Sequence, residues 1–90
     1  MSEAVSTDEI IGTVIELVAK EFGTQVSELG PDVNLTELEG ADSVKVLRVV
    51  AQIERAYDVE LDDDLVFNSK TARDVAEGVH SMLAAGLATP

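Results

Sequence analysis

The residues from 38 to 61 decide the fold of this chain, and they read LEGADSVKVLRVVAQIERAYDVEL. A turn-forming Gly40 is followed by Asp42-Ser43 and then by a strongly periodic segment that reaches Tyr57. At 100° per residue, this segment forms one apolar stripe, made of Val46, Val50, Ile53 and Tyr57 with Val49 and Ala56 beside it. The pattern predicts a helix over residues 43–57 with that stripe in the core.

The opposite side of this predicted helix mixes apolar and cationic residues, namely Val44, Leu47, Arg48, Ala51 and Arg55. A face that is only solvated has little physical reason to carry Val44 and Leu47. Residues 43–57 hold three bases against one acid, a net charge of +2, whereas the whole chain carries −12 and the remainder therefore −14. The positive charge of the molecule is concentrated on this helix.

Composition sets the class of protein. Ninety residues with 46% hydrophobic content support one small domain, expected over residues 1–90 and structured over about 7–84. No apolar run approaches the roughly 20 residues that a membrane helix needs, and the N-terminus lacks a basic signal region, so we expect a cytoplasmic protein without a membrane partner. The charge of −12 argues against nucleic acid and for basic partners. No cysteine is present, which excludes disulfides and thiolate metal sites.

Three further helices are predicted. The first covers about residues 7–22, begins with a capping box of Ser6 and Glu9, and ends before Gly23. It is expected to bury Ile10, Val14, Leu17 and Val18, with Ile11 and Phe22 at the edge of the stripe. A short helix follows at about 62–68, its three aspartates at the positive end of the dipole. The last starts near Thr71, with Thr71 and Asp74 as a capping box, and buries Val75, Val79, Met82 and Leu83.

A loop of about twenty residues, 23–42, separates the first two helices. It contains several turn formers, and Val33, Leu35 and Leu38 recur within it. We expect these apolar residues to pin the loop across the helices, because a loop of this length in a compact domain is usually functional or disordered. The predicted fold is all-α: a small four-helix bundle with three main helices, a short third helix and a long first connection.

Ser43 stands where the loop meets the central helix. The simplest role of a serine there is to cap the helix. However, Val46 lies where a capping box needs Glu or Gln, and Asp42 can cap the helix equally well. Ser43 would then face outward in the first turn, where the helix dipole would stabilise a phosphate attached to its hydroxyl. On local grounds both roles remain open.

The stretch LTELEGADSVKVLRVVAQIERAYDVELDDDL resembles the centre of an acyl carrier protein. The hallmark of that family is Gly-x-Asp-Ser-Leu, matched here by Gly40-Ala41-Asp42-Ser43-Val44, and the similarity extends over about residues 7–84. The resemblance implies a fold of acyl-carrier type in which a phosphopantetheinyl transferase modifies Ser43. The Ser43 oxygen would attack the pyrophosphate of coenzyme A, and Asp42 would help to place the serine against the transferase's metal. The product is a 4'-phosphopantetheine arm that carries acyl or aminoacyl groups as thioesters.

Several features depart from the family pattern. Val44 replaces the usual leucine, Glu39 is an extra residue, and the usually acidic second helix carries Lys45, Arg48 and Arg55. Because like charges oppose docking, we expect poor engagement with the partners of fatty-acid carriers and favour a stand-alone carrier of polyketide or nonribosomal-peptide biosynthesis. A peptidyl carrier and a fatty-acid carrier stay as alternatives, although GADS resembles acyl carriers more than peptidyl ones. The three cations could also be an ordinary solvated face.

The expected docking surface lies beside Ser43 and consists of Val44, Lys45, Leu47, Arg48, Ala51 and Arg55. The expected partners are the transferase, an acyl- or aminoacyl-loading enzyme, and ketosynthase, condensation or tailoring enzymes that act on a monomeric carrier. We expect no catalytic activity, because Ser43 has no general base in view and His80 has no evident acid-base partner. The acidic run at 58–69 does not fit a calcium loop, since Asp63 and Ser69 stand where Gly and Glu are needed. An unmodified helical interaction module, with Ser43 as a cap, is the alternative from another class.

Overall fold

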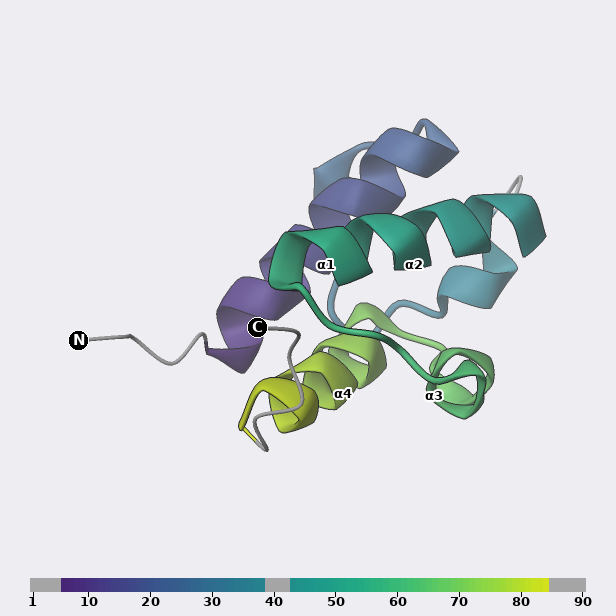
Figure 1. Cartoon of the computed structure of the whole chain (residues 1–90). Helices are drawn as coiled ribbons and strands as arrows, with labels where there is room; N and C mark the ends of the chain where they lie inside the picture. The colour runs from purple at the N-terminus through teal and green to yellow at the C-terminus, as the bar shows by residue number, and fades with distance from the viewer. Residues whose placement is uncertain (1–5, 39–42, 85–90) are drawn as a thin grey trace.

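The computed structural model describes residues 6–38 and 43–84, without the side chains of Ser43, Asp63 and Phe67. Its elements are helical throughout the described ranges and occur in the order α1 (Thr7–Phe22), η1 (Val26–Glu28), η2 (Leu35–Glu37), α2 (Ser43–Tyr57), α3 (Asp63–Asn68) and α4 (Ala72–Ala84). The predicted all-α fold with three main helices and a short third helix is confirmed. In Figure 1, α1 and α2 form the upper layer, and α3 and α4 lie below them.

Helix α1 has the ends that its sequence predicts. Ser6 is the N-cap, and its Oγ accepts a hydrogen bond from the backbone N–H of Glu9 at 3.1 Å. Gly23 ends the helix in the left-handed conformation, with φ 70°, and its N–H bonds the carbonyl of Ala19. Glycine adopts this conformation without the steric cost that a Cβ would impose.

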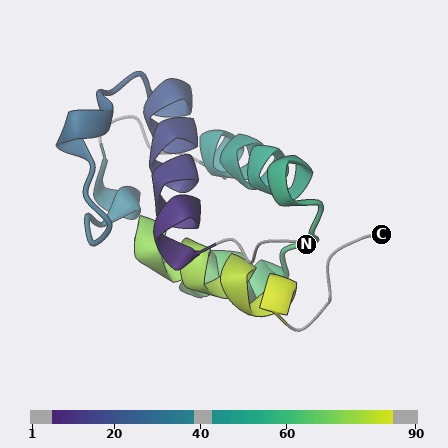
Figure 2. The ribbon, with the colours of Figure 1, turned by 90° about the vertical axis from the view of Figure 1, so that its left-hand side faces the viewer.

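The buried face of α1 is wider than the predicted stripe. Ile10, Val14 and Val18 are buried as expected, but Ile15 and Ala19 are buried too, while Leu17 is only half-buried. The reason is that α1 packs against both α4 and α2 and also contacts η1. Figure 2 shows α1 between the long loop on one side and α2 on the other. A helix with neighbours on several sides buries more than one stripe.

Helix α2 has the predicted bounds, but its buried face is rotated from the predicted stripe. Val49 and Ile53 are its most buried residues, at 6% and 1% exposure. Val46, expected in the core, is 37% exposed, and Ala56, expected at its edge, is exposed as well. The side of α2 that carries Val46 lines a cavity rather than solid core, so the predicted core position of Val46 is wrong.

The C-terminus of α2 reverses sharply at Asp58, which has φ 56°. The N–H of Val59 bonds the carbonyl of Glu54 at 3.1 Å, and the Val59 side chain is 2% exposed. This is the hydrogen bond of a helix C-terminal motif that normally favours glycine or asparagine at the left-handed position. It directs the chain from α2 toward α3.

Helix α4 begins with the predicted capping box. The N–H of Asp74 donates to Thr71 Oγ1 at 3.1 Å, and Asp74 Oδ2 accepts from the N–H groups of Thr71 and Lys70 at 3.3 and 3.0 Å. Its buried residues are Ala72, Ala76 and Val79, whereas the predicted Val75, Met82 and Leu83 are half-buried. Small alanines let α1 and α4 approach closely, so the large side chains lie at the edges of the contact.

The long loop is pinned, as predicted, across the bundle. Leu35 and Leu38 pack against the core, and the backbone N–H of Leu35 donates to the carbonyl of Lys70 at 2.7 Å. Arg73 joins the loop to α4 twice: its backbone N–H donates to the carbonyl of Pro31, and its guanidinium bonds both carboxylate oxygens of Asp32 at 2.8 and 3.2 Å. The two short 3₁₀ helices were not predicted.

Helix α3 lies close against α4 because Gly78 has no side chain. A Cβ built on Gly78 would stand 2.5 Å from Cδ1 of Leu65, nearer than two carbons can approach. The predicted α3 is confirmed to within one residue, with Asp62 at the N-cap position, although no side-chain cap hydrogen bond forms there. Leu65 and Val66 are half-buried, as expected of anchoring residues.

Candidate functional site

Ser43 is the first residue of α2, a helix of 15 residues. The first turn of α2 contains no acidic residue. The backbone N–H groups at the start of a helix have no partner within the helix, and the helix dipole is positive there. Both favour a negatively charged group, so the start of α2 fits a phosphodiester. Asp42, predicted to support the attachment, lies outside the described residues, and so does the rest of the Gly40–Asp42 motif.

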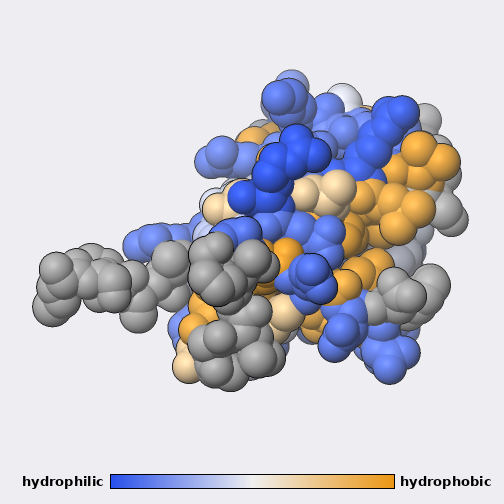
Figure 3. Space-filling model, viewed as in Figure 1, coloured by the Kyte–Doolittle hydropathy of each residue, from blue (hydrophilic) through white to orange (hydrophobic). Residues whose placement is uncertain are grey.

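Beside Ser43, α2 presents apolar side chains to solvent. Val44 is 57% and Leu47 63% exposed, and Ala51 is exposed one turn further on. Arg48 and Arg55 are exposed on the same side of the helix. Figure 3 shows hydrophobic residues gathered over the N-terminal part of α2. Five of the six predicted docking residues therefore lie at the surface together.

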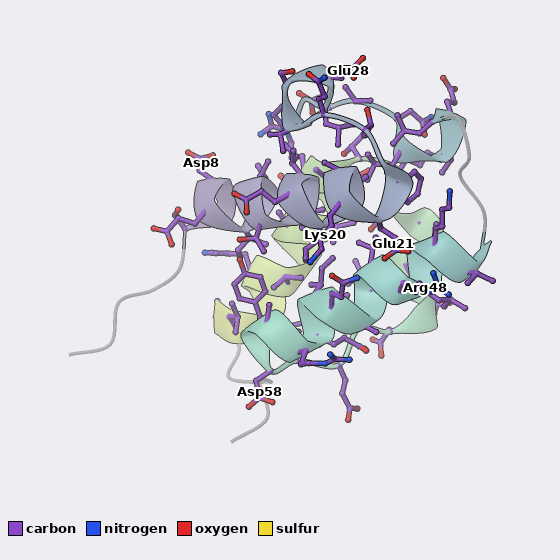
Figure 4. All side chains as sticks on the ribbon, turned by 90° about the horizontal axis from the view of Figure 1, so that it is seen from above. Asp8, Lys20, Glu21, Glu28, Arg48 and Asp58 are labelled. Carbon is purple, nitrogen blue, oxygen red and sulfur yellow. The ribbon has the colours of Figure 1, made fainter. Side chains whose placement is uncertain are left out.

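Two of the three cations on α2 are directed toward α1. Arg48 Nη1 lies 3.3 Å from Glu21 Oε2, and Gln52 Nε2 donates to the other oxygen of the same carboxylate at 3.3 Å. Figure 4 shows Glu21 and Arg48 reaching toward each other between the two helices. Lys45, the sixth predicted docking residue, is half-buried, with its Nζ 5.7 Å from the centroid of the Phe22 ring. These contacts hold α2 against α1.

An apolar cavity of about 640 Å³ opens beside the same face of α2. It lies among the four α-helices and the loop, and is open to solvent where the exposed side chains of Val46, Leu47 and Ala51 form part of its wall. Its remaining walls come mainly from Val14, Val18, Phe22, Leu35, Val49, Val50, Ile53, Leu61, Leu65, Val66 and Val75. The sequence pattern did not predict this cavity. One feature of the sequence pointed to it: α2 has more apolar residues than a single buried stripe requires.

The main polar side chain in the cavity wall already has a hydrogen-bond partner. Glu54 is half-buried, and its Oε2 accepts a hydrogen bond of 2.8 Å from the backbone N–H of Leu61. Ser69 Oγ likewise donates to the carbonyl of Leu65 at 2.7 Å. These polar atoms are engaged by the protein itself, so the cavity is suited to an apolar occupant.

The described part of the chain shows no cluster of three or more residues that could hold a metal ion, and none of its helices is long and apolar enough to cross a membrane. His80 is half-buried in α4. The pKa of Asp32 lies below its ordinary value, chiefly because Arg73 hydrogen-bonds its carboxylate. Asp32 belongs to the loop contact with α4 and not to the Ser43 end of α2.

Comparison with known proteins identifies the family. A family model described as "Phosphopantetheine attachment site" matches residues 12–79. Curated acyl carrier proteins are similar over most of the chain: that of Kocuria rhizophila is 32% identical over 69 residues, covering 77% of this chain and 85% of its own length. That of Exiguobacterium sibiricum is 28% identical over 79 residues, covering 88% of this chain and its own full length.

A solved structure has the same fold. The NMR structure of the HMG-ACPI domain from the CurA module of Lyngbya majuscula superposes with a TM-score of 0.80, covering 96% of this chain and 89% of that one, at 20% identity. The chain belongs to the family of carrier proteins with a phosphopantetheine attachment site. Its prosthetic group is 4'-phosphopantetheine, and proteins of this kind carry intermediates rather than transform them.

Proposed function

We propose that this chain is a single carrier domain that holds acyl intermediates on a 4'-phosphopantetheine arm attached to Ser43, in polyketide or nonribosomal-peptide biosynthesis. The observation that carries the proposal is the position of Ser43 as the first residue of α2, before an acid-free first turn and beside exposed Val44 and Leu47. When attached, the arm supplies a thiol that carries the cargo as a thioester. The protein itself contributes the hydroxyl of Ser43 and a surface on which enzymes recognise it.

The cavity supports an acyl cargo over an aminoacyl one. Its wall is almost entirely aliphatic, and its polar atoms at Glu54 and Ser69 already have partners within the protein. A charged amino group placed there would lose its hydration, and Glu54, the one acidic residue that lines the cavity within the described part of the chain, already accepts a hydrogen bond from the N–H of Leu61. The curated relatives are acyl carrier proteins, in agreement with this preference.

The charge of α2 supports a pathway other than fatty-acid synthesis. Arg48 and Arg55 are exposed, although Arg48 also pairs with Glu21 of α1, and partners that bind acidic carriers through Arg and Lys would be repelled. The carrier would act as a cytoplasmic monomer between a transferase, a loading enzyme, and ketosynthase, condensation or tailoring enzymes. A fatty-acid carrier is the second candidate, since the curated relatives carry the general name acyl carrier protein.

The test is modification of the full chain by a broad-specificity phosphopantetheinyl transferase with coenzyme A and Mg²⁺, followed by intact-mass spectrometry. We expect the mass of one phosphopantetheine to be added to the native chain and none to Ser43→Ala. The matched control is Ser81→Ala, which removes an exposed serine hydroxyl from α4 and should be modified as the native chain is. If several transferases leave the chain unmodified while they modify a reference carrier, the fold serves as an unmodified interaction module.

A further inference from the structure

We propose that the outward face of α2 docks onto enzyme surfaces that present an apolar recess flanked by carboxylates. This inference rests on the proposed carrier function and specifies its partners. The docking face consists of Val44, Leu47, Arg48, Ala51 and Arg55, and Lys45 lies at its α1 edge.

The five residues of the docking face share one side of the helix. At 100° per residue they fall within about 100° of its circumference. The buried residues Val49 and Ile53 point the opposite way, into the core. The docking face is thus a narrow strip along α2. The strip begins next to Ser43, the proposed attachment point.

The centre of the docking face is apolar. Val44 and Leu47 are 57% and 63% exposed, and they are two of the four large hydrophobic residues that the described part of the chain exposes. Ala51 extends the strip by one turn without obstructing the two larger side chains. Apolar anchors of this kind contribute affinity when a partner recess removes them from water.

Positive charge lies along the same strip. Arg48 keeps 65% of its side chain exposed despite its ion pair with Glu21, and Arg55 is exposed and forms no ion pair within the described residues. The only acid within α2, Glu54, is half-buried and bonded to the N–H of Leu61. A carboxylate on a partner would therefore meet the guanidinium of Arg55 and the exposed part of Arg48, whose guanidinium is also paired with Glu21.

The overall charge of −12 does not prevent such docking. At physiological salt the Debye length is about 8 Å, so charges on the far side of the molecule are largely screened at the interface. Within about that distance, the charges on α2 determine which partner surfaces attract the docking face. The negative remainder of the chain then disfavours approach in other orientations.

The test compares one phosphopantetheinyl transferase in two forms. One form has a basic carrier-facing surface, and in the other those bases are changed to Glu. The KM of the full chain is measured by intact mass at low and at physiological salt. We expect the native chain to have the lower KM with the acidic form and to lose that advantage with salt. Arg55→Glu should raise the KM for the acidic form roughly 3- to 10-fold and lower it for the basic form.

Lys70→Glu is the matched control, because it makes the same change in charge at an exposed residue outside α2. It should shift neither KM in the way that Arg55→Glu does. Arg48→Gln is a second variant that removes a charge without placing a carboxylate beside Glu21, and it should act in the same direction as Arg55→Glu. If Arg55→Glu and Lys70→Glu behave alike, or the native chain prefers the basic form, the inference is wrong while the carrier function stands. If neither form modifies any variant, although both modify a reference acyl carrier protein, both proposals fail.

Discussion

At the scale of single residues, α2 contains two large aliphatic side chains with opposite environments. Leu47 is 63% exposed and Ile53 is 1% exposed, six residues apart on the same helix. Periodicity predicted both positions correctly, because the two residues lie about 120° apart around an amphipathic helix. It did not predict the exposure of Val46, since that depends on a cavity whose wall is formed by all four helices and the loop once they have packed together.

This contrast gives a paired prediction. Leu47→Ala should lower the free energy of unfolding by at most about 0.5 kcal/mol, as is usual at the surface, and reduce kcat/KM for loading roughly tenfold, which corresponds to about 1.4 kcal/mol of binding. Ile53→Ala should cost about 2–5 kcal/mol of stability through the cavity it leaves. Chemical denaturation and loading kinetics on the same preparations measure both effects. Equal losses of stability and loading in Leu47→Ala would show that Leu47 belongs to the core.

At the scale of the elements, helix ends were predicted better than helix faces. The ends depend on local hydrogen bonds, such as those of Ser6 with Glu9 and of Thr71 with Asp74, which a few neighbouring residues determine. The faces depend on which helices pack together. In α4 the apolar pattern predicted that the large side chains are buried. Ala72 and Ala76 are fully buried instead, because their small size permits the close approach of α1.

The capping box of α4 can be tested directly. Asp74→Ala removes the acceptor for the N–H groups of Lys70 and Thr71, and should lower the free energy of unfolding by about 1–2 kcal/mol. The control is Glu77→Ala, an exposed acidic residue of the same helix, which should change stability by no more than about 0.5 kcal/mol. Urea denaturation of both variants gives the comparison. Similar small losses in the two would mean that the cap contributes little.

At the scale of the whole molecule, the long loop is tied to α4 by Asp32 and Arg73, 41 residues apart. Sequence patterns predicted that the loop is pinned, through its apolar residues, but not this pair. Exposed charges carry no periodic signal, and their pairing depends on the final arrangement of the chain. The site was predictable to the same degree: the position of Ser43 at the start of α2 followed from local sequence, and the cavity along α2 did not.

The Asp32–Arg73 contact should make stability depend on pH. The hydrogen bond from Arg73 lowers the pKa of Asp32 in the folded chain, so the unfolded chain binds the proton more readily. The stabilisation is present above the ordinary aspartate pKa of about 3.9 and is lost as pH falls through the lower folded value. Asp32→Asn should therefore have a lower Tm than the native chain at neutral pH, with the difference vanishing in acid.

Thermal unfolding from about pH 7 down to about pH 3 follows this difference across the relevant window. Asp64→Asn is the control, because Asp64 is exposed and makes no ion pair within the described residues. A Tm difference for Asp32→Asn that stays constant across the range would mean that the contact is not the source of the pH dependence.

Gly78 of α4 does not line the cavity, but it contacts a residue that does. Leu65 occupies the position that a side chain at 78 would need, and Leu65 is also part of the cavity wall. Any larger residue at 78 would displace Leu65, and with it a part of the cavity wall. The shape of the cavity can thus be altered from a residue that neither lines it nor belongs to the proposed docking face.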